Sequence, residues 1–332
     1  MKNKKKLYKI IAIAALTIFV IYELVVRIGY DSKKDIKWGV AFSKPYAVYL
    51  GLDWQKLFND MINDLGVKAV RLPIYWDDVE REKDSYNFSD YDWMMEQAQK
   101  ANVEVVFVIG QRLPRWPECH RPPWLNSMSQ EDQDAELLDW IYDVVKRYGG
   151  YENVIMWQVE NEPFLTLFGK CEKVNPELLK REVDLVKSLD NRPVLITDSG
   201  ELSLWMRSSR VGDYLGTTVY RTVYNPIIGY WSYFWLPASS YRFKSRLNFF
   251  SWDKMIISEL QAEPWYPKGN ALNTDLDEQF KSINPEKFQD NIKYAQKMGF
   301  SQVYLWGVEW WGWLKKNKGD DRMWEAARDV FR

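Results

Sequence analysis

VIMWQVENEPF, the stretch at residues 154–164, decides the fold of this chain of 332 residues. An apolar run of strand length leads directly into Glu160, Asn161 and Glu162. A second stretch, MIISELQAEPW at residues 255–265, has the same form, an apolar run that ends in a carboxylate, Glu259. Both stretches predict buried strands that carry acidic side chains at their carboxyl ends.

From residue 36 onward, short apolar runs alternate with segments of helical periodicity, and no linker or low-complexity tract divides them. Repeated strand–helix units of this kind predict a (β/α)₈ TIM barrel, which typically needs about 250 residues. A doubly wound open sheet is the main alternative, but no G-x-G-x-x-G fingerprint opens any unit. The predicted strands are residues 38–43, 69–76, 103–110, 154–160, 194–198, 215–220, 255–259 and 303–307.

The first 35 residues form a separate unit. Five lysines within residues 2–9 precede an apolar run that ends at Arg27, which is typical of a secretory signal or a signal anchor. No A-x-A-like cleavage site follows, and the 17 residues between Lys9 and Arg27 can span a bilayer if the flanking charges snorkel. We therefore expect residues 1–35 to anchor an extracytoplasmic domain, residues 36–332, in the membrane. Cleavage of the leader would secrete that domain instead.

Composition excludes several classes of function. The net charge is −1 for the whole chain and −6 after residue 35, so nucleic acid is not an expected partner. One histidine, His120, and two cysteines cannot form a zinc ribbon or a multi-histidine metal site, so we expect no metal or organic cofactor. The aromatic content of 16% suits stacking on sugar faces, although core packing could use many of these rings.

Glu162 and Glu259 end the fourth and seventh predicted strands. Barrel chemistry lies at the carboxyl ends of the strands, so the two side chains could face one another across the barrel. Glycoside hydrolysis needs such a pair: one carboxyl group protonates the departing oxygen, and the other attacks the anomeric carbon or activates water. Glu263 is an alternative to Glu259, which we prefer because it directly ends the apolar run. Glu160 and Glu309 are expected in supporting positions.

The sequence resembles the clan A glycoside hydrolases at four points, especially the family 5 cellulase and mannanase barrels. Asn161-Glu162-Pro163 resembles the motif whose Glu is the acid/base, and Glu259 resembles the strand-seven nucleophile. Arg71 in AVRLPIYW resembles the arginine that supports the nucleophile, and Trp306 in VYLWG resembles the tryptophan that floors the catalytic subsite. The resemblance implies a retaining mechanism, in which Asn161 could donate to the sugar 2-hydroxyl.

The resemblance also predicts a His-x-Tyr pattern near strand six, where this sequence has Val219-Tyr220-Arg221. Tyr220 would orient the nucleophile through its hydroxyl, with Tyr224 as the alternative. His120 lies in the loop after strand three, where it either contacts the substrate or the acid/base, or packs within the loop.

Cys119 and Cys171 fall in the loops after strands three and four, which are adjacent at the barrel mouth. Outside the cytoplasm we expect them to form a disulfide, with two free thiols as the alternative. Residues 224–252 contain eleven aromatic side chains, and they pack over the barrel, cover the cleft or rest on the membrane.

The sequence therefore predicts a membrane-anchored, monomeric, retaining glycoside hydrolase with a carbohydrate substrate. A non-catalytic sugar-binding barrel at the cell surface is the alternative, and the presence of both Glu162 and Glu259 argues against it. A metal-dependent barrel hydrolase is disfavoured by the single histidine. The glycan, its linkage and endo or exo action do not follow from the sequence.

Overall fold

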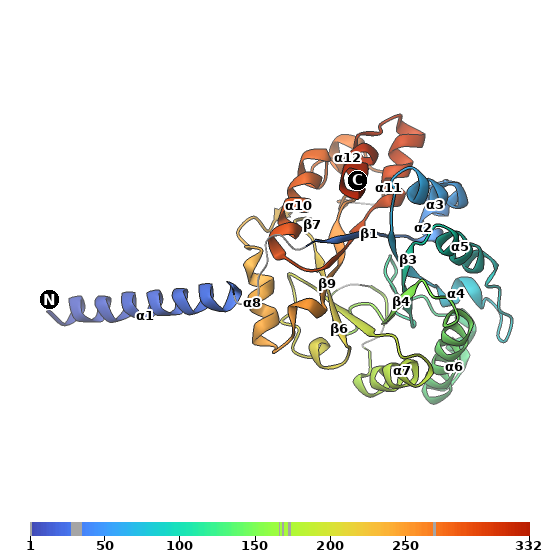
Figure 1. Cartoon of the computed structure of the whole chain (residues 1–332), viewed down its shortest axis with the longest axis horizontal. Coiled ribbons are helices and arrows are strands. Elements are labelled where there is room, and N and C mark those ends of the chain that lie inside the picture. The colour runs from blue at the N-terminus through green and yellow to red at the C-terminus, as the bar shows by residue number, and fades with distance from the viewer. Residues whose placement is uncertain (1, 28–34, 166, 168, 172–173, 268–269) are drawn as a thin grey trace.

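The computed structural model describes residues 2–27, 35–165, 167, 169–171, 174–267 and 270–332, and its centre is a closed barrel of parallel strands (Figure 1). The strands follow the order β1-β10-β9-β6-β5-β4-β3-β2 around the ring. The predicted TIM barrel is thus confirmed, and the open doubly wound sheet is wrong. The strands are β1 (Lys37–Ala41), β2 (Ala69–Pro73), β3 (Glu104–Ile109), β4 (Val154–Val159), β5 (Val194–Asp198), β6 (Tyr214–Val219), β9 (Met255–Gln261) and β10 (Gln302–Trp306).

Helices surround the barrel, and local sequence signals set their ends. Asn175 and Asn284 cap α7 and α10, each with a proline at the first helical position, and Gly299 ends α10 at a φ of 74°. The longer barrel helices are α3 (Trp54–Asn63), α5 (Ser89–Lys100), α6 (Gln130–Tyr148), α7 (Pro176–Leu189), α8 (Ser239–Leu247), α10 (Pro285–Met298) and α12 (Arg322–Phe331). The shorter ones are α2 (Lys44–Tyr49), α4 (Trp76–Val79), α9 (Leu276–Gln279) and α11 (Val308–Trp313).

The fifth strand–helix unit departs from the repeat. Residues 199–213 are all described, and the only helix among them is the 3₁₀ turn η2 (Ser208–Arg210). Asp198 accepts hydrogen bonds from the hydroxyls of Ser203 and Ser208, and the fully buried Trp205 donates to the carbonyl of Ser199 at 2.9 Å. Local side-chain bonds of this kind compete with helix formation, so a buried ring fills the place of a helix.

The interior of the barrel is built in layers. Its lower layer is apolar. Two residues further along β2, β4 and β5, the side chains that face the interior of the barrel are Arg71, Gln158 and Thr197. This polar layer lies directly under the mouth. Gly39 of β1 gives room to the lower layer, because a Cβ there would meet the carbonyl oxygen of Ala69 at 2.5 Å. The lower layer consists of Ala69, Val106, Met156, Leu195, Ile256 and Tyr304.

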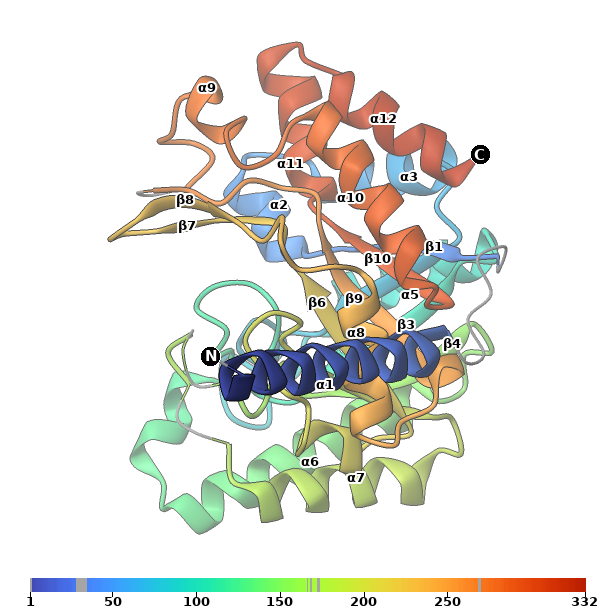
Figure 2. The ribbon, with the colours of Figure 1, turned by 90° about the vertical axis from the view of Figure 1, so that its left-hand side faces the viewer.

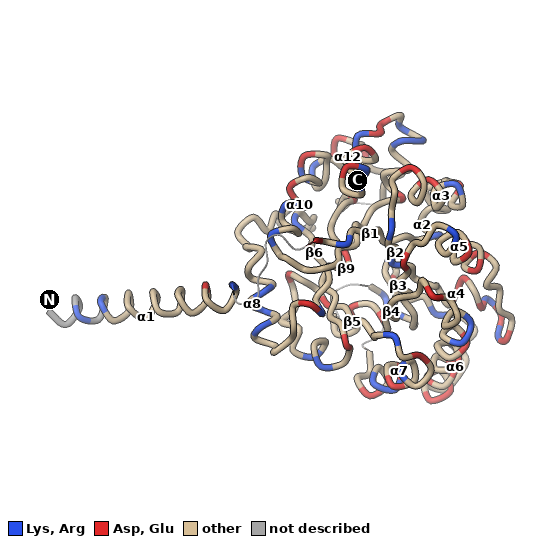
Figure 3. The backbone as a smooth tube through the Cα atoms, viewed as in Figure 1, with Lys and Arg blue, Asp and Glu red and all other residues tan. Residues whose placement is uncertain are grey.

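A single helix, α1 (Lys2–Arg27), projects away from the barrel (Figures 1 and 2). Figure 3 shows that its charged residues lie at its two ends. The stretch Tyr8–Arg27 has a mean hydropathy of 2.3 and is almost wholly exposed, so it is long and apolar enough to cross a membrane as a signal or an anchor. Its last turns pack on α8: the Tyr22 hydroxyl lies 2.6 Å from that of Ser239, and Arg242 donates to the carbonyl of Val26 at 3.0 Å.

The aromatic segment that follows β6 contains a hairpin, β7 (Thr222–Asn225) and β8 (Gly229–Ser232), followed by α8. Tyr241 and Trp252 are buried, Tyr241 within the main hydrophobic core, which agrees with packing over the barrel for part of the segment. Seven of its large apolar side chains are exposed: Ile227, Ile228, Trp231, Phe234, Trp235, Leu247 and Phe249.

The predicted disulfide is present. Cys119 and Cys171, with Cα atoms 4.8 Å apart, join the loop between β3 and α6 to the loop between β4 and α7. Disulfides of this kind persist outside the cytoplasm, which agrees with an extracytoplasmic location.

We expect both cysteines of the unreduced, denatured protein to resist thiol labelling, and the Cys119→Ser/Cys171→Ser double variant to be less stable. The bridge spans a sequence separation of 52 residues. Chain-entropy arguments give a loss of about 4 kcal/mol for a loop of that length. Urea unfolding measures the difference, with reduced wild-type protein as the control that should match the variant. Labelling of either cysteine before reduction would contradict the bridge.

Candidate active site

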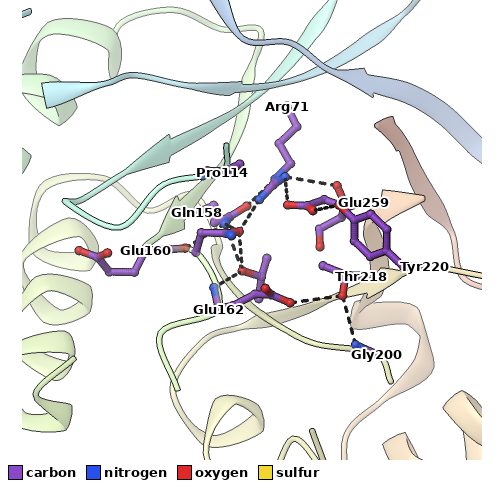
Figure 4. Close-up of polar contacts among 12 residues, drawn as sticks. Arg71, Pro114, Gln158, Glu160, Glu162, Gly200, Thr218, Tyr220 and Glu259 are labelled. Carbon is purple, nitrogen blue, oxygen red and sulfur yellow. Dashed lines mark hydrogen bonds and ion pairs between the residues drawn. The ribbon is translucent and has the colours of Figure 1, made fainter. Parts of the chain in front are cut away.

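The two predicted carboxylates lie at the mouth of the barrel, at the ends of β4 and β9 (Figure 4). Glu162 follows β4 in a tight turn, and its own φ of 44° is left-handed, a strained conformation that clusters at functional sites. Glu162 is 8% exposed and Glu259 is 5% exposed. The site is therefore largely shielded from water.

A bulge in β9 turns Glu259 into the barrel. Thr217 and Thr218 of β6 pair with Ile257 and Glu259, so one extra residue, Ser258, is inserted on β9. The pairing of β9 with β10 shows the same shift, because Val303 pairs with Ile257 and Leu305 with Leu260. Ile257 and Leu260 both pack in the outer core. Without the bulge, simple alternation from Ile256 in the interior layer would point Glu259 outward.

Glu259 is held by two donors. Arg71 Nη1 lies 2.9 Å from Oε1, and the Tyr220 hydroxyl lies 2.7 Å from Oε2. Burial, together with the charge of Glu259, raises the pKa of Tyr220 well above its usual value, so the phenol stays protonated and donates. Both carboxyl oxygens of Glu259 thus accept a hydrogen bond from a side-chain donor. The alternative tyrosine, Tyr224, lies on β7 against Tyr230.

Glu162 has the opposite environment. Its Oε1 lies 3.2 Å from the Thr218 hydroxyl, and its backbone N–H donates to the Thr197 hydroxyl at 2.9 Å. Burial raises the pKa of Glu162 well above its usual value, and the negative charges of Glu259, Glu118 and Asp198 raise it further. Glu162 is thus suited to hold a proton at neutral pH.

Asn161 lies between the two carboxylates. Its Oδ1 accepts from Arg71 Nη2 at 2.8 Å and from the Thr197 hydroxyl at 3.2 Å. Gln158 Oε1 in turn accepts from Arg71 Nε at 2.7 Å. With its oxygen engaged, the Asn161 amide presents its N–H₂ group as the donor for a bound molecule.

Three further glutamates surround the pair without joining it. Figure 4 shows the Glu160 carboxyl group turned away, where it accepts from the backbone N–H of Gln111 at 2.9 Å and of Arg112 at 2.6 Å. Glu263 and Glu309 form ion pairs with Arg115 instead. These contacts agree with the supporting positions expected of Glu160 and Glu309. Glu263, the alternative nucleophile, is engaged in its ion pair with Arg115.

Two further predicted residues, His120 and Trp306, lie against Arg115. His120 lies in the β3–α6 loop, where its ring packs on Tyr75 and its Nε2 lies 3.1 Å from the carbonyl oxygen of Arg115. Trp306, at the end of β10, has the guanidinium of Arg115 over its ring at 4.0 Å.

Sequence reasoning missed Gln158, Thr197, Thr218 and Arg115. The first three lie on predicted strands, so the polar side chains that interrupt those apolar runs were a usable signal. Arg115 lies in a loop rich in proline and arginine, and nothing in its spacing distinguishes it from its neighbours.

Two cavities lie elsewhere on the surface. One, of about 440 Å³, is lined by residues 86–89 with Asp92, Asp143 and Arg147. The other, of about 140 Å³, lies beside the disulfide and is lined by Gln111, Arg121 and Asn175, among others. Neither is lined by Glu162 or Glu259.

Comparison with known proteins gives one family and a set of similar folds. The chain matches the cellulase family, glycosyl hydrolase family 5, over residues 46–305. A β-galactosidase from Bacillus circulans sp. alkalophilus is similar in structure, with a TM-score of 0.57, 12% identity, and coverage of 83% of this chain and 51% of that one. Xylanase 10B from Thermotoga petrophila RKU-1, in complex with xylobiose, has a TM-score of 0.56 and 18% identity, with coverage of 82% of each chain.

At these identities the likeness shows the barrel fold alone. This chain spans about half the length of that β-galactosidase, with 51% covered. No curated protein matches it in sequence.

We expect Glu259→Gln to lower the pKa of Glu162, because the variant removes the charge that disfavours ionisation of the neighbouring carboxyl group. A ¹³C NMR titration of the glutamate side chains measures this value. Glu152→Gln, on the surface, is the control and should leave Glu162 unchanged. An unaltered Glu162 pKa in Glu259→Gln would show that the two groups are not coupled.

Proposed function

We propose a mechanism from the premise that this chain belongs to the cellulase family, glycosyl hydrolase family 5, and is an O-glycosyl hydrolase. Glu162 is the acid/base and Glu259 is the nucleophile of a retaining reaction on an oligosaccharide or polysaccharide. The family match confirms the resemblance found in the sequence, and a carbohydrate substrate follows from it.

One observation carries the assignment of roles, namely the opposite environments of the two carboxyl groups. Arg71 and Tyr220 donate hydrogen bonds to the two carboxyl oxygens of Glu259. Burial and nearby negative charge favour the protonated form of Glu162. A glycosidase needs one carboxyl group that holds a proton at neutral pH and a second that serves as the nucleophile, and these environments assign the first role to Glu162 and the second to Glu259.

The reaction follows in two steps. Glu162 gives its proton to the glycosidic oxygen while Glu259 attacks the anomeric carbon, so the leaving sugar departs and a glycosyl ester forms. Glu162, now ionised, takes a proton from water, and that water attacks the anomeric carbon and frees Glu259. The N–H₂ group of Asn161 donates to the sugar 2-hydroxyl, a contact that strengthens in the transition state.

A non-catalytic sugar-binding barrel remains the competing function. It would need neither a protonated Glu162 nor an ionised Glu259, so the paired environments argue against it. Turnover of aryl glycosides in the presence of a chelator separates this alternative, and a metal-dependent hydrolase, from the proposed enzyme.

We also propose that α1 stays attached and holds the barrel at the outer face of a membrane. The support is the packing of Tyr22 on α8, where its ring lies 5.1 Å from that of Phe243 and its hydroxyl meets Ser239. A leader that is removed has no reason to make specific contacts with the mature domain. Residues 1–35 are then the anchor, and residues 36–332 the catalytic domain.

Replacement of the two glutamates should give different chemistry. Glu259→Ala should abolish turnover of every glycoside, because the nucleophile is gone. Glu162→Ala should lose about 10²–10⁴-fold on substrates with poor leaving groups and much less on dinitrophenyl glycosides, since a good leaving group needs no proton. Added azide should restore turnover in both variants.

The azide products identify the roles. Glu162→Ala should yield a glycosyl azide of retained configuration, and Glu259→Ala one of inverted configuration. NMR of the products measures this. Opposite stereochemistry, or an inverting wild type, would refute the assignment. Full activity of Glu259→Ala together with its loss in Glu263→Ala would move the nucleophile to Glu263.

The anchor has its own test. Full-length protein should sediment with membranes, and a protein that begins at residue 36 should stay in the supernatant. Carbonate extraction distinguishes a spanning helix from a loosely bound protein. A full-length gene product that is soluble and begins after Tyr22 would show that the leader is cleaved.

A further inference from the structure

The β7–β8 hairpin ends in an apolar turn. Pro226, Ile227 and Ile228 join the two strands, and the isoleucines are 92% and 59% exposed. Turns usually carry glycine, proline or short polar residues, so two adjacent isoleucines are unusual there. Asn225 Oδ1 accepts from the backbone N–H groups of Ile227 at 2.8 Å and of Ile228 at 3.3 Å, and Pro226 has no N–H group. The turn thus presents apolar side chains while its own backbone donors are satisfied.

A row of aromatic rings connects this hairpin with the start of α8. The ring centroids of Trp231 and Tyr233 are 6.5 Å apart, and those of Tyr233 and Trp235 are 6.3 Å apart. Both tryptophans are exposed, and Phe234 between them is 81% exposed. We call the exposed apolar side chains of the hairpin and its continuation the apolar rim: Ile227, Ile228, Trp231, Phe234 and Trp235.

Hydrogen bonds fix the segment that carries the apolar rim. The carbonyl oxygen of Leu236 accepts from the hydroxyl of Tyr294 on α10 at 2.9 Å and from Arg221 Nη1 at 3.3 Å. The backbone N–H of Tyr233 donates to the carbonyl oxygen of Arg221 at 3.0 Å. The exposure of the rim is therefore a feature of a segment that is bound to the barrel, and not of a loose loop.

The helix α1 indicates what covers the apolar rim. The Tyr22 hydroxyl meets Ser239, the first residue of α8, and a tyrosine at the end of an apolar helix is typical of the water–lipid interface. Trp235 is four residues before Ser239, so their Cα atoms are at most about 14 Å apart. Figure 2 shows the hairpin tip on the same side of the molecule as the N-terminal end of α1, the end that a bilayer would contain. The rim thus continues the surface at which α1 would leave the membrane.

The charge of the segment favours a lipid surface over a second copy of the chain. Residues 224–252 contain three basic side chains and no acidic one, whereas the chain after residue 35 has a net charge of −6. Basic segments beside a spanning helix are attracted to anionic headgroups, and tryptophan prefers the interfacial region. A symmetric contact between two copies would instead bring like charges together.

We propose that the apolar rim is a second membrane contact, which rests in the interfacial region of the bilayer that α1 spans. This inference rests on the proposed anchor and is independent of the roles assigned to Glu162 and Glu259. A contact of five side chains is far weaker than a spanning helix, so a protein that begins at residue 36 still stays in the supernatant.

The second contact also orients the barrel mouth. Tyr220, whose hydroxyl bonds Glu259, lies seven residues before Ile227, a span of at most about 25 Å. One edge of the mouth is then held close to the bilayer. The substrate that this geometry favours is a glycan at the membrane surface.

Tryptophan fluorescence of the full-length protein tests the contact. The first tryptophan of the chain is Trp38, so α1 contributes no signal and all of the fluorescence comes from the barrel. The protein is placed in nanodiscs of phosphatidylcholine and phosphatidylglycerol, with either ordinary acyl chains or acyl chains brominated near the headgroup. Bromine quenches tryptophans that touch the lipid, so we expect weaker fluorescence in the brominated discs.

Two double variants locate the contact. Trp231→Tyr/Trp235→Tyr should lose most of the quenching, because it removes the two fluorophores of the rim. Ile227→Asp/Ile228→Asp keeps every tryptophan and should also lose most of it, because charge at the hairpin tip withdraws the rim from the lipid. Trp116→Tyr is the matched control: Trp116 is 69% exposed in the loop after β3, and its variant should be quenched like the wild type.

The outcomes separate this contact from the anchor. If the full-length protein does not enter the discs, or begins after Tyr22, the anchor fails and the contact fails with it. If it enters the discs and fluoresces equally in both, only the contact fails. Two copies in each disc without quenching would show that a second copy covers the rim. Quenching that survives both double variants in folded protein, as judged by circular dichroism, would place the lipid contact elsewhere on the barrel and refute the proposal.

Discussion

A fully buried guanidinium, that of Arg71, ties the site together. An isolated charge in such a place would be costly by several kcal/mol, and only good pairing offsets that penalty. Gln158 and Asn161 from the β4 side and Glu259 from β9 provide the pairing. One side chain of β2 thus sets the separation of the strand ends that carry both carboxyl groups.

The difference between Glu162 and Glu259 follows from this centre. Arg71 bonds to Glu259 and not to Glu162. The negative charge of Glu259 then raises the pKa of Glu162 across the mouth. The two groups have the same chemistry in solution, so their division of labour is a property of the barrel. Below both groups, the polar layer of Arg71, Gln158 and Thr197 rests on the apolar lower layer of the interior.

The sequence allowed the barrel to be predicted because each strand is a short apolar run and each run ends at the same face. Glu162, Glu259 and Asn161 were placed at the mouth in this way, since strand ends in a parallel barrel meet at one mouth. Arg71, inside β2, was predicted only from the resemblance to the clan A glycoside hydrolases. The sequence could not show the bulge at Ser258, which depends on register with β6 and β10. Nor could it show Arg115, whose partners are 148 and 194 residues away along the chain. The missing helix after β5 was likewise hidden, because a buried tryptophan replaces it.

The contact between α1 and α8 has a further consequence for how a membrane-anchored barrel would encounter its substrate. Tyr22 is five residues before Arg27, or about 7.5 Å along a helix that rises 1.5 Å per residue. Because Ser239 of α8 touches Tyr22, about the last 7.5 Å of α1 would lie outside the bilayer, and α8 would lie directly against its outer surface. Figure 2 shows the tip of the β7–β8 hairpin on the same side of the molecule as the N-terminal end of α1. Diffusion of the barrel would then be confined to two dimensions. The local concentration of glycan in that thin layer, and not its concentration in bulk, would set the rate of encounter.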